Sequence, residues 1–159
     1  APSLFPVANT ACKPNGRKED AIMSDTVYSA HAHTVGGRNG AARTDDGKLD
    51  VKLAYPTVLG GDGNGTNPEQ LFAAGYGACF TGALGFVARQ EKIALGDHSL
   101  DVTIELIRDP PTFKIGATLT LTAPALDRAT AQSLLEKAHA VCPYSKATRG
   151  NVEVKLAVA

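Results

Sequence analysis

Three segments in the second half of the chain alternate between apolar and polar side chains. In residues 100–106, Leu, Val, Ile and Leu occupy every second position, between Asp, Thr and Glu. Residues 113–121 and 152–158 follow the same period. A period of two is typical of strands in a sheet that has one buried face and one wet face. These segments therefore predict an antiparallel sheet.

Between residues 26 and 54 the pattern predicts shorter strands that are separated by turns. Residues 35–40 are Val-Gly-Gly-Arg-Asn-Gly and residues 45–47 are Asp-Asp-Gly, both dense in turn-forming residues. Apolar and polar side chains then alternate over residues 49–53. The following segment, 55–66, is rich in glycine and predicts a loop.

A long helix is predicted to begin after Asn67 and to end near Gln90. Asn67 is a favourable N-cap, Pro68 suits the first helical position, and Glu69 suits the positive end of the helix dipole. Small residues recur along one face at steps of three and four: Gly75, Ala78, Gly82 and Gly85. Each interior glycine costs about 1 kcal/mol relative to alanine. Close approach of another backbone is the usual reason for such a stripe, so we expect one there.

A second, amphipathic helix is predicted between the last two strands. Asp127 can cap its start, His139 lies in its last turn, and Pro143 is expected to end it. Its apolar face consists of Ala131, Leu134, Leu135, Ala138 and Val141. With no long βαβ alternation and no internal repeat, the order of elements predicts an α+β fold of antiparallel sheet and two helices.

Composition narrows the class of protein. The 159 residues are enough for one domain with a hydrophobic core. The 16 Lys and Arg balance the 16 Asp and Glu, so no basic excess points to nucleic acid. The uncharged stretch 70–88 approaches the length of a membrane span, but its polar residues and glycines favour a buried helix of a soluble protein. We therefore expect neither a nucleic-acid partner nor a membrane.

The first 22 residues follow no pattern. They contain proline, asparagine and a charged cluster but no continuous apolar run of a secretory signal. We expect residues 1–22 to be a loose extension, with Cys12 an incidental thiol, and residues 23–159 to form a single domain. The sparse, odd cysteine count does not resemble a secreted disulfide framework and favours a cytoplasmic protein.

Two cysteines lie in patterned regions, and each has two interpretations. Cys79 is in the middle of the long helix and Cys142 is where the second helix ends. Both could be small core residues, since free cysteine is commonly buried. If they are reactive, Cys142 suits a resolving role better, because a helix C-terminus disfavours a thiolate.

The other candidate residues also allow more than one interpretation. Arg38 is a solvated turn residue or a cation that lowers the pKa of a thiol, and Glu69 either complements the helix dipole or binds such a cation. His31 and His33 are two apart on one strand, but no third ligand accompanies them, so we expect no metal.

Two longer segments resemble a known family. NPEQLFAAGYGACFTGAL (67–84) and VCPYSKATRGNV (141–152) are similar to the two cysteine signatures of the organic hydroperoxide resistance (Ohr) branch of the OsmC/Ohr family. The GGRNG turn and the YPTVLGG segment follow the same order, and the resemblance runs from about Tyr28 to the end. The sequence departs from the family at Asn39, Gly77 and Lys146, where Asp, Ala and Asn are common.

The resemblance implies a cysteine peroxidase of organic hydroperoxides, including fatty-acid peroxides, that functions in the oxidative stress response. Cys79 matches the peroxidatic cysteine and Cys142 the resolving cysteine, while Arg38 and Glu69 match the pair that organises the thiolate. It also implies an intertwined homodimer with sheets wrapped around two helices. Recycling by a dithiol such as a dihydrolipoyl group or lipoylated protein is implied, without metal, haem or flavin.

The apolar residues near Cys79 suggest the substrate preference. Phe72, Phe80 and Leu71 would favour alkyl hydroperoxides over hydrogen peroxide. Two alternatives remain: an OsmC-type peroxidase of broader substrate range, and a non-enzymatic lipid-binding module whose thiols are packing residues. Thiol titration separates the second, because a binding module has no fast-reacting cysteine.

Helix geometry adds a prediction about subunits. Glu69 and Cys79 are ten positions apart, about 15 Å along a helix axis and about 80° apart around it. A glutamate side chain cannot span that distance. Antiparallel pairing of two such helices near Ala74 would bring Glu69 of one chain level with Cys79 of the other, so we expect a shared site across a two-fold axis.

Overall fold

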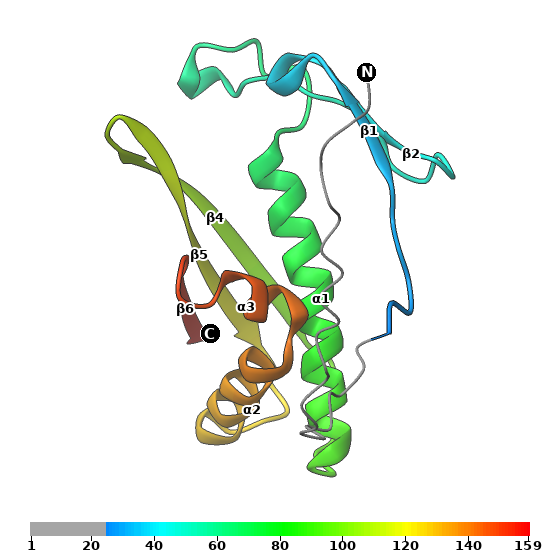
Figure 1. Ribbon diagram of the computed structural model, residues 1–159. Coiled ribbons are helices and arrows are strands. Elements are labelled where there is room, and N and C mark those ends of the chain that lie inside the picture. The colour runs from blue at the N-terminus through cyan, green and yellow to red at the C-terminus, as the bar shows by residue number, and fades with distance from the viewer. Residues whose placement is uncertain (1–24) are drawn as a thin grey trace, which may run out of the picture. The chain divides into compact units, whose positions relative to one another are not determined.

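The computed structural model describes residues 25–159, of which residues 31–159 form one compact unit (Figure 1). Residues 25–30 contain no helix or strand, so the predicted strand region begins later than residue 26. The predicted extension 1–22, with Cys12, and Met23 lie outside the described residues. The proposed division of the chain at residue 23 therefore stays a prediction.

The first sheet is small and antiparallel. It contains β1 (Ala32–Val35), β2 (Ala41–Thr44) and β3 (Asp50–Lys52), in that order. The predicted turn at 35–40 contains a short 3-10 helix, Gly37–Asn39, which carries Arg38. The glycine-rich loop contains a second 3-10 helix, Thr57–Leu59, and leads into the long helix.

The long helix α1 spans Pro68–Gln90, and its predicted start is confirmed. The side chain of Asn67 accepts a hydrogen bond from the backbone N–H of Gln70 at 2.9 Å, and Pro68 is the first helical residue. One side of α1 is buried in the core through Tyr76, Phe80, Leu84, Val87 and Ala88.

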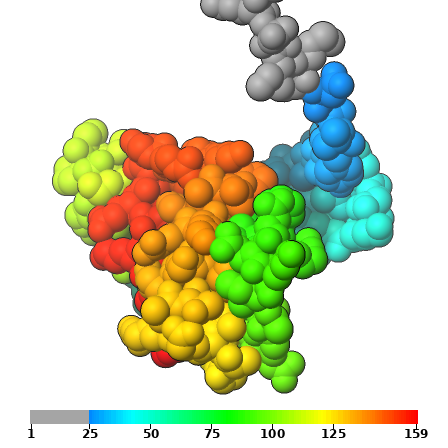
Figure 2. Space-filling view, turned by 90° about the horizontal axis from the view of Figure 1, so that it is seen from below, coloured from blue at the N-terminus to red at the C-terminus, as the bar shows by residue number. Residues whose placement is uncertain are grey.

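The opposite side of α1 is not covered by its own chain. Ala74, Ala78 and Gly82 are exposed, and Phe86 has an exposed fraction of 46%. The helix is long and apolar enough to cross a membrane by length and composition, yet only 33% of its most apolar window is buried. The prediction of a central buried helix therefore holds for one side only within a single chain. Figure 2 shows this helix in green beside the yellow and orange atoms of α2.

The second sheet consists of β4 (Ser99–Asp109), β5 (Thr112–Thr122) and β6 (Glu153–Val158). The strands β4 and β5 pair in an antiparallel hairpin as predicted. However, β6 runs parallel to β5, so the prediction of a purely antiparallel sheet is wrong for this pair. Alternation reports a half-buried strand but not its direction, which here is set by the helical connection between β5 and β6.

That connection consists of α2 (Arg128–Val141) and a shorter helix, α3 (Pro143–Thr148). The N-cap of α2 is Asp127, as predicted, and its side chain accepts from the backbone N–H of Thr130. Pro143 does end α2, but it also begins α3, which the sequence analysis missed. Proline is well suited to a first helical position, so one residue has both effects. Cys142 therefore lies at the corner between two helices.

The fold class is thus confirmed as α+β, with two sheets and a long helix as the principal element. The core forms where α1, α2 and the second sheet meet. Leu119 and Leu121 of β5 and Leu134 and Leu135 of α2 are fully buried there, with exposed fractions of at most 1%. This packing fixes α2 against α1 and so places the corner at Cys142 beside the middle of α1.

Candidate active site

The two cysteines of the patterned region face each other. The Sγ atoms of Cys79 and Cys142 are 3.6 Å apart, and both are free thiols. Cys142 is fully buried, whereas Cys79 is partly exposed on α1. A disulfide has an S–S distance of about 2.05 Å, so a small movement would join them. The prediction that the second helix ends over the middle of the first is confirmed.

The surroundings of Cys79 within its own chain do not favour a thiolate. Burial raises the pKa of the Cys79 thiol, the backbone N–H of Tyr144 acts in the opposite direction, and the neighbouring Cys142 thiol raises the pKa further. The pKa of Cys79 is therefore above its ordinary value. A reactive cysteine has a pKa below that value, usually because a cation is close. The described part of a single chain, residues 25–159, therefore places no activating cation at this sulfur.

A cation bound by a carboxylate lies near the start of α1, where the carboxylate of Glu69 binds Arg38. The Arg38 guanidinium donates to both Glu69 carboxylate oxygens, with Nη1–Oε2 at 2.8 Å and Nη2–Oε1 at 2.6 Å. Hydrogen bonds from Arg38 lower the pKa of the Glu69 carboxyl despite its partial burial. Such a two-pronged pair fixes the plane of the guanidinium. Arg38 and Glu69 were predicted as partners, and the structure brings them together.

The turn that carries Arg38 requires its glycines. Gly36 has a φ of 70°, a backbone conformation that residues other than glycine rarely adopt. A Cβ at Gly40 would lie 1.7 Å from the carbonyl oxygen of Val35. The Asn39 side chain accepts from the backbone N–H of Tyr55 at 3.2 Å, which ties the turn to the next loop. Arg38 also lies over the Tyr55 ring, at 5.9 Å from its centre.

These two pairs remain separate within one chain. Glu69 and Cys79 are ten residues apart on the unbroken helix α1, which separates them by about 15 Å along the axis. Among the described residues, the neighbours that shift the pKa of Cys79 are Tyr144 and Cys142, and Arg38 is not one of them. The structure therefore assembles two halves of the predicted site without joining them.

One of the predicted substrate-binding residues is in the wrong place for that role. Phe80 has no exposed surface and packs against the rings of Tyr76 and His139, with ring centres 6.3 and 6.5 Å away. A side chain with no exposed surface contributes to the core and not to a substrate surface. Phe72 is half-buried and stacks on Tyr144 at 5.9 Å, and Leu71 is also half-buried.

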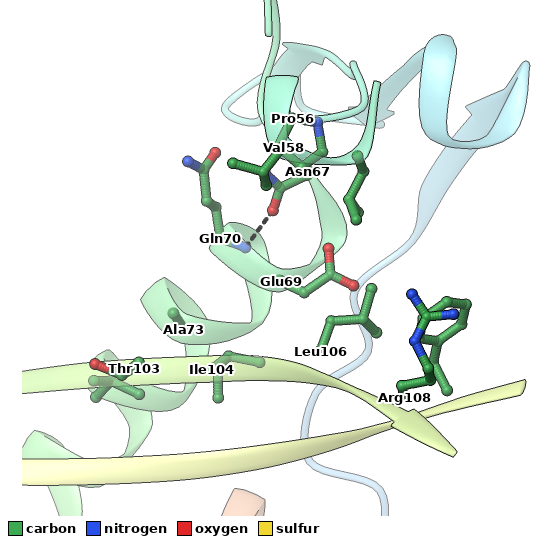
Figure 3. A pocket seen from close by; sticks show the side chains of 13 residues that line it. Pro56, Val58, Asn67, Glu69, Gln70, Ala73, Thr103, Ile104, Leu106 and Arg108 are labelled. Atoms are coloured by element: carbon green, nitrogen blue, oxygen red, sulfur yellow. Dashed lines mark hydrogen bonds between the residues drawn. The ribbon is translucent and has the colours of Figure 1, made fainter. Parts of the chain in front are cut away.

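An apolar cavity lies beside Glu69, and none of those three residues lines it. It has a volume of about 610 Å³ and lies between the start of α1, the loop before it and the strands β4 and β5. Figure 3 shows Glu69, Leu106 and Arg108 around the same hollow. A neighbouring cavity of about 630 Å³ reaches Arg38 and Tyr55. Four residues line both cavities: Leu59, Glu69, Leu106 and Phe113.

The sequence alone does not reveal these lining residues, for a simple reason. Alternation identifies Leu106 and Phe113 as strand residues, but it does not show which helix end their strands cross. It also missed Tyr55 and the backbone N–H of Tyr144, which act through contacts that only the fold creates. Of the two histidines considered for metal binding, His31 contacts Asp45 at 2.8 Å on an exposed surface. No group of three ligand residues suited to a metal occurs within residues 25–159.

Comparison with known proteins identifies relatives that match most of the chain. Residues 61–157 match the family described as OsmC-like protein. The organic hydroperoxide resistance protein of Xanthomonas axonopodis pv. citri is 51% identical over 141 residues, which is 87% of this chain and 99% of that protein. Two crystal structures are similar as well. An organic hydroperoxide resistance protein from Legionella pneumophila has a TM-score of 0.82 and 48% identity, over 85% of this chain and 99% of that one. OhrB of Bacillus subtilis has a TM-score of 0.78 and 46% identity, over 84% and 100%.

Proposed function

The chain belongs to the OsmC-like family, in its organic hydroperoxide resistance branch, and from this membership we propose that it is a thiol-dependent peroxidase of organic hydroperoxides. One observation carries the proposal: a partly exposed thiol, Cys79, lies 3.6 Å from a fully buried one, Cys142. An exposed thiol can meet a substrate, and a buried thiol beside it can form a disulfide with it afterwards. The alternative of a lipid-binding module gives no reason for this arrangement.

The reaction begins at the exposed sulfur. The Cys79 thiolate attacks the distal oxygen of the hydroperoxide, so that an S–O bond forms while the O–O bond breaks. The sulfur is oxidised to a sulfenic acid, and the leaving alkoxide takes up a proton to become an alcohol. A guanidinium close to the sulfur stabilises both the thiolate and the developing alkoxide. Arg38 is suited to that task because Glu69 holds its orientation.

The second step uses the buried thiol. The sulfur of Cys142 attacks the sulfur of Cys79, an S–S bond forms, and the hydroxyl leaves as water with the thiol proton of Cys142. A dithiol then reduces the disulfide by exchange. Since Cys79 is the exposed partner, the dithiol attacks there and Cys142 leaves. We propose a dihydrolipoyl group, free or on a lipoylated protein in the cytoplasm, as that dithiol, on the strength of the family resemblance.

We further propose that the active protein is a homodimer in which each site is shared. Two features support this arrangement. Within residues 25–159, no cation of the same chain shifts the pKa of the Cys79 thiol, and one side of α1 is exposed and apolar, with small residues at Ala74, Ala78 and Gly82. A Cβ at Gly82 would meet nothing within 4 Å, so packing within the described part of a single chain does not require a glycine there. If two copies of α1 packed antiparallel, each would cover the exposed side of the other. Arg38 of one chain would then lie near Cys79 of the other.

The alkyl group of the substrate would then lie in the apolar cavity beside Arg38 and Glu69. Leu106→Ala is expected to lower kcat/KM for cumene hydroperoxide about tenfold, since an apolar pocket discriminates by about 1–3 kcal/mol per methylene-sized change. The rate with hydrogen peroxide, which has no alkyl group, should not change. The measurement is the initial rate with each peroxide.

Ile107→Ala is the matched control for that prediction. Ile107 is adjacent to Leu106 in β4, so its side chain points to the other face of the sheet, and it does not line the cavity. It should lose stability without a change in peroxide preference. Equal losses for both peroxides in Leu106→Ala would contradict the assignment of this cavity to the alkyl group.

A steady-state assay tests the proposed function as a whole. With dihydrolipoamide as reductant, we expect the protein to reduce cumene hydroperoxide with kcat/KM at least about tenfold above that for hydrogen peroxide, again because of apolar contacts with the substrate. A broader OsmC-type enzyme would show similar values for the two. A lipid-binding module would show no turnover, and titration of its thiols would find no fast-reacting cysteine.

A further inference from the structure

A hydroxyl group behind the cysteine pair joins three helices at a single point. We propose that Ser145, held between Tyr76 and His139, is a positioning residue for disulfide formation and keeps Cys142 within reach of Cys79. This inference rests on the proposed function for its biological meaning. The structural effect can be measured without peroxide.

The contacts of Ser145 are short and buried. Its Oγ lies 2.9 Å from the hydroxyl of Tyr76 and 2.9 Å from Nδ1 of His139. Ser145 and Tyr76 both have exposed fractions of 0%. A serine hydroxyl has one proton and two lone pairs, so it can bind both partners at once. Tyr76 belongs to α1, His139 to α2 and Ser145 to α3, and the shared hydroxyl therefore links all three helices.

The location of Ser145 connects this link to the reactive pair. Ser145 is three residues after Cys142, which is one turn of α3, and Tyr76 is three residues before Cys79, which is one turn of α1. Each cysteine thus lies one helical turn from a member of the same hydrogen bond. Fixing Tyr76 against Ser145 fixes the separation of the two helix segments that carry the sulfurs.

A second contact stabilises the corner from the outside. The Arg149 guanidinium donates to the carbonyl oxygens of His139 at 2.9 Å and Ala140 at 3.3 Å, in the last turn of α2. Arg149 follows α3 directly, so the start and the end of α3 are both attached to α2. Burial, with a smaller effect of Arg149, lowers the pKa of His139, which favours the neutral ring, whose Nδ1 can form a hydrogen bond with Ser145. Cys142 therefore lies in a segment that is closed by two contacts, one between His139 and Ser145 and one between Arg149 and the last turn of α2.

Precise placement matters because disulfide formation competes with a side reaction. The sulfenic acid of Cys79 either reacts with Cys142 and releases water, or meets a second hydroperoxide and is oxidised to a sulfinic acid while an alcohol leaves. The first outcome is reversible by a dithiol and the second is not. The two sulfurs, already 3.6 Å apart, need only a small approach. A wider or more variable separation slows closure and favours the irreversible product.

The test separates closure from the earlier attack on peroxide. Tyr76→Phe and Ser145→Ala each remove one partner of the hydrogen bond between the Tyr76 and Ser145 hydroxyl groups. In rapid-quench experiments with cumene hydroperoxide, we expect the rate of Cys79 oxidation to stay within about twofold. Disulfide formation should slow about tenfold, since a misplacement of about 1 Å can cost up to about a hundredfold. Mass spectrometry of Cys79 should show a matching rise in sulfinic acid.

Two further variants distinguish positioning from general loss of stability. Leu119→Val, in the same core but on β5, which carries none of the three hydrogen-bonded groups, should lower the melting temperature without changing the partition between disulfide and sulfinic acid. His139→Asn retains a polar atom near the position of Nδ1 and should keep most of the closure rate, whereas His139→Leu should not. Tyr76→Phe is the decisive variant if Ser145→Ala does not fold.

An equilibrium measurement makes the inference independent of peroxidase activity. In glutathione redox buffers, the Cys79–Cys142 disulfide of Tyr76→Phe should be about tenfold less favoured than in the unsubstituted protein, a change of about 30 mV for a two-electron couple. Unchanged equilibrium and unchanged closure in folded Tyr76→Phe would overturn the proposal. An unsubstituted protein that forms the disulfide in these buffers but does not react with hydroperoxide would instead refute the proposed function.

Discussion

Replacing Cys79 by serine is expected to abolish peroxide turnover, with a loss of at least about a thousandfold, the order of effect that removal of a nucleophile has in other enzymes. A hydroxyl is far weaker than a thiolate as a nucleophile at neutral pH. Of the two facing thiols, only Cys79 is exposed to an incoming substrate. The measurement is steady-state consumption of cumene hydroperoxide with dihydrolipoamide as reductant.

The matching substitution at Cys142 should have a different effect. Cys142→Ser is expected to consume about one equivalent of peroxide per site and then stop, because attack by Cys79 precedes disulfide formation. Cys12→Ala serves as the control and should retain the kinetics of the unsubstituted protein, since Cys12 lies outside the region similar to the family. Full turnover by Cys79→Ser would refute the mechanism, and a large loss in Cys12→Ala would assign a role to the N-terminal segment.

Local chemistry explains which parts of the fold the sequence predicted. The start of α1 was predicted to the residue because Asn67, Pro68 and Glu69 act through their own backbone neighbours. The strands β4 and β5 were predicted because burial on one face imposes a period of two. Pro143 shows the limit of this approach. Its missing N–H ends one helix and is equally suited to begin another, so α3 could not be predicted from that residue alone.

The site was predictable in its parts and not in its assembly. Arg38 and Glu69 are 31 positions apart, and their pairing depends on how the turn at 35–40 folds over the start of α1. Phe80 was assigned to the substrate from its proximity to Cys79 in sequence, but adjacent helical residues point in directions about 100° apart. Phe80 consequently faces the core while Cys79 faces the surface. The polar contacts of Ser145 involve three helices, and no local pattern predicts such a meeting.

A hybrid dimer is expected to reveal that each active site uses both chains. In this hybrid one chain carries Cys79→Ser and the other carries Arg38→Ala with Glu69→Ala. If sites are shared, the intact Cys79 of the second chain faces the intact Arg38 and Glu69 of the first, and one site stays complete. The hybrid should then retain about half of the activity of the unsubstituted dimer, because a two-fold contact makes two equivalent sites.

The reciprocal hybrid supplies the control. Here all three substitutions are placed in one chain and the partner chain is unsubstituted. If sites are shared, the intact Cys79 faces the substituted Arg38 and Glu69 positions, while the intact Arg38 faces a serine, so both sites are damaged. Both hybrids carry the same three substitutions, and only the distribution of these substitutions between the two chains differs. Any difference in activity therefore reports which chain supplies the arginine.

The geometry of one chain makes the expected outcome specific. The helix α1 is unbroken from Pro68 to Gln90, so Glu69 and Cys79 stay about 15 Å apart along it, and Arg38 is bound to Glu69 by two hydrogen bonds. For Arg38 to serve the Cys79 of its own chain, that ion pair would have to break. Activity in the reciprocal hybrid and none in the first would mean that this happens, and the shared site would be wrong. Activity in the first hybrid alone would assign Arg38 and Glu69 to the partner's thiol, where a cation lowers the pKa that burial raises.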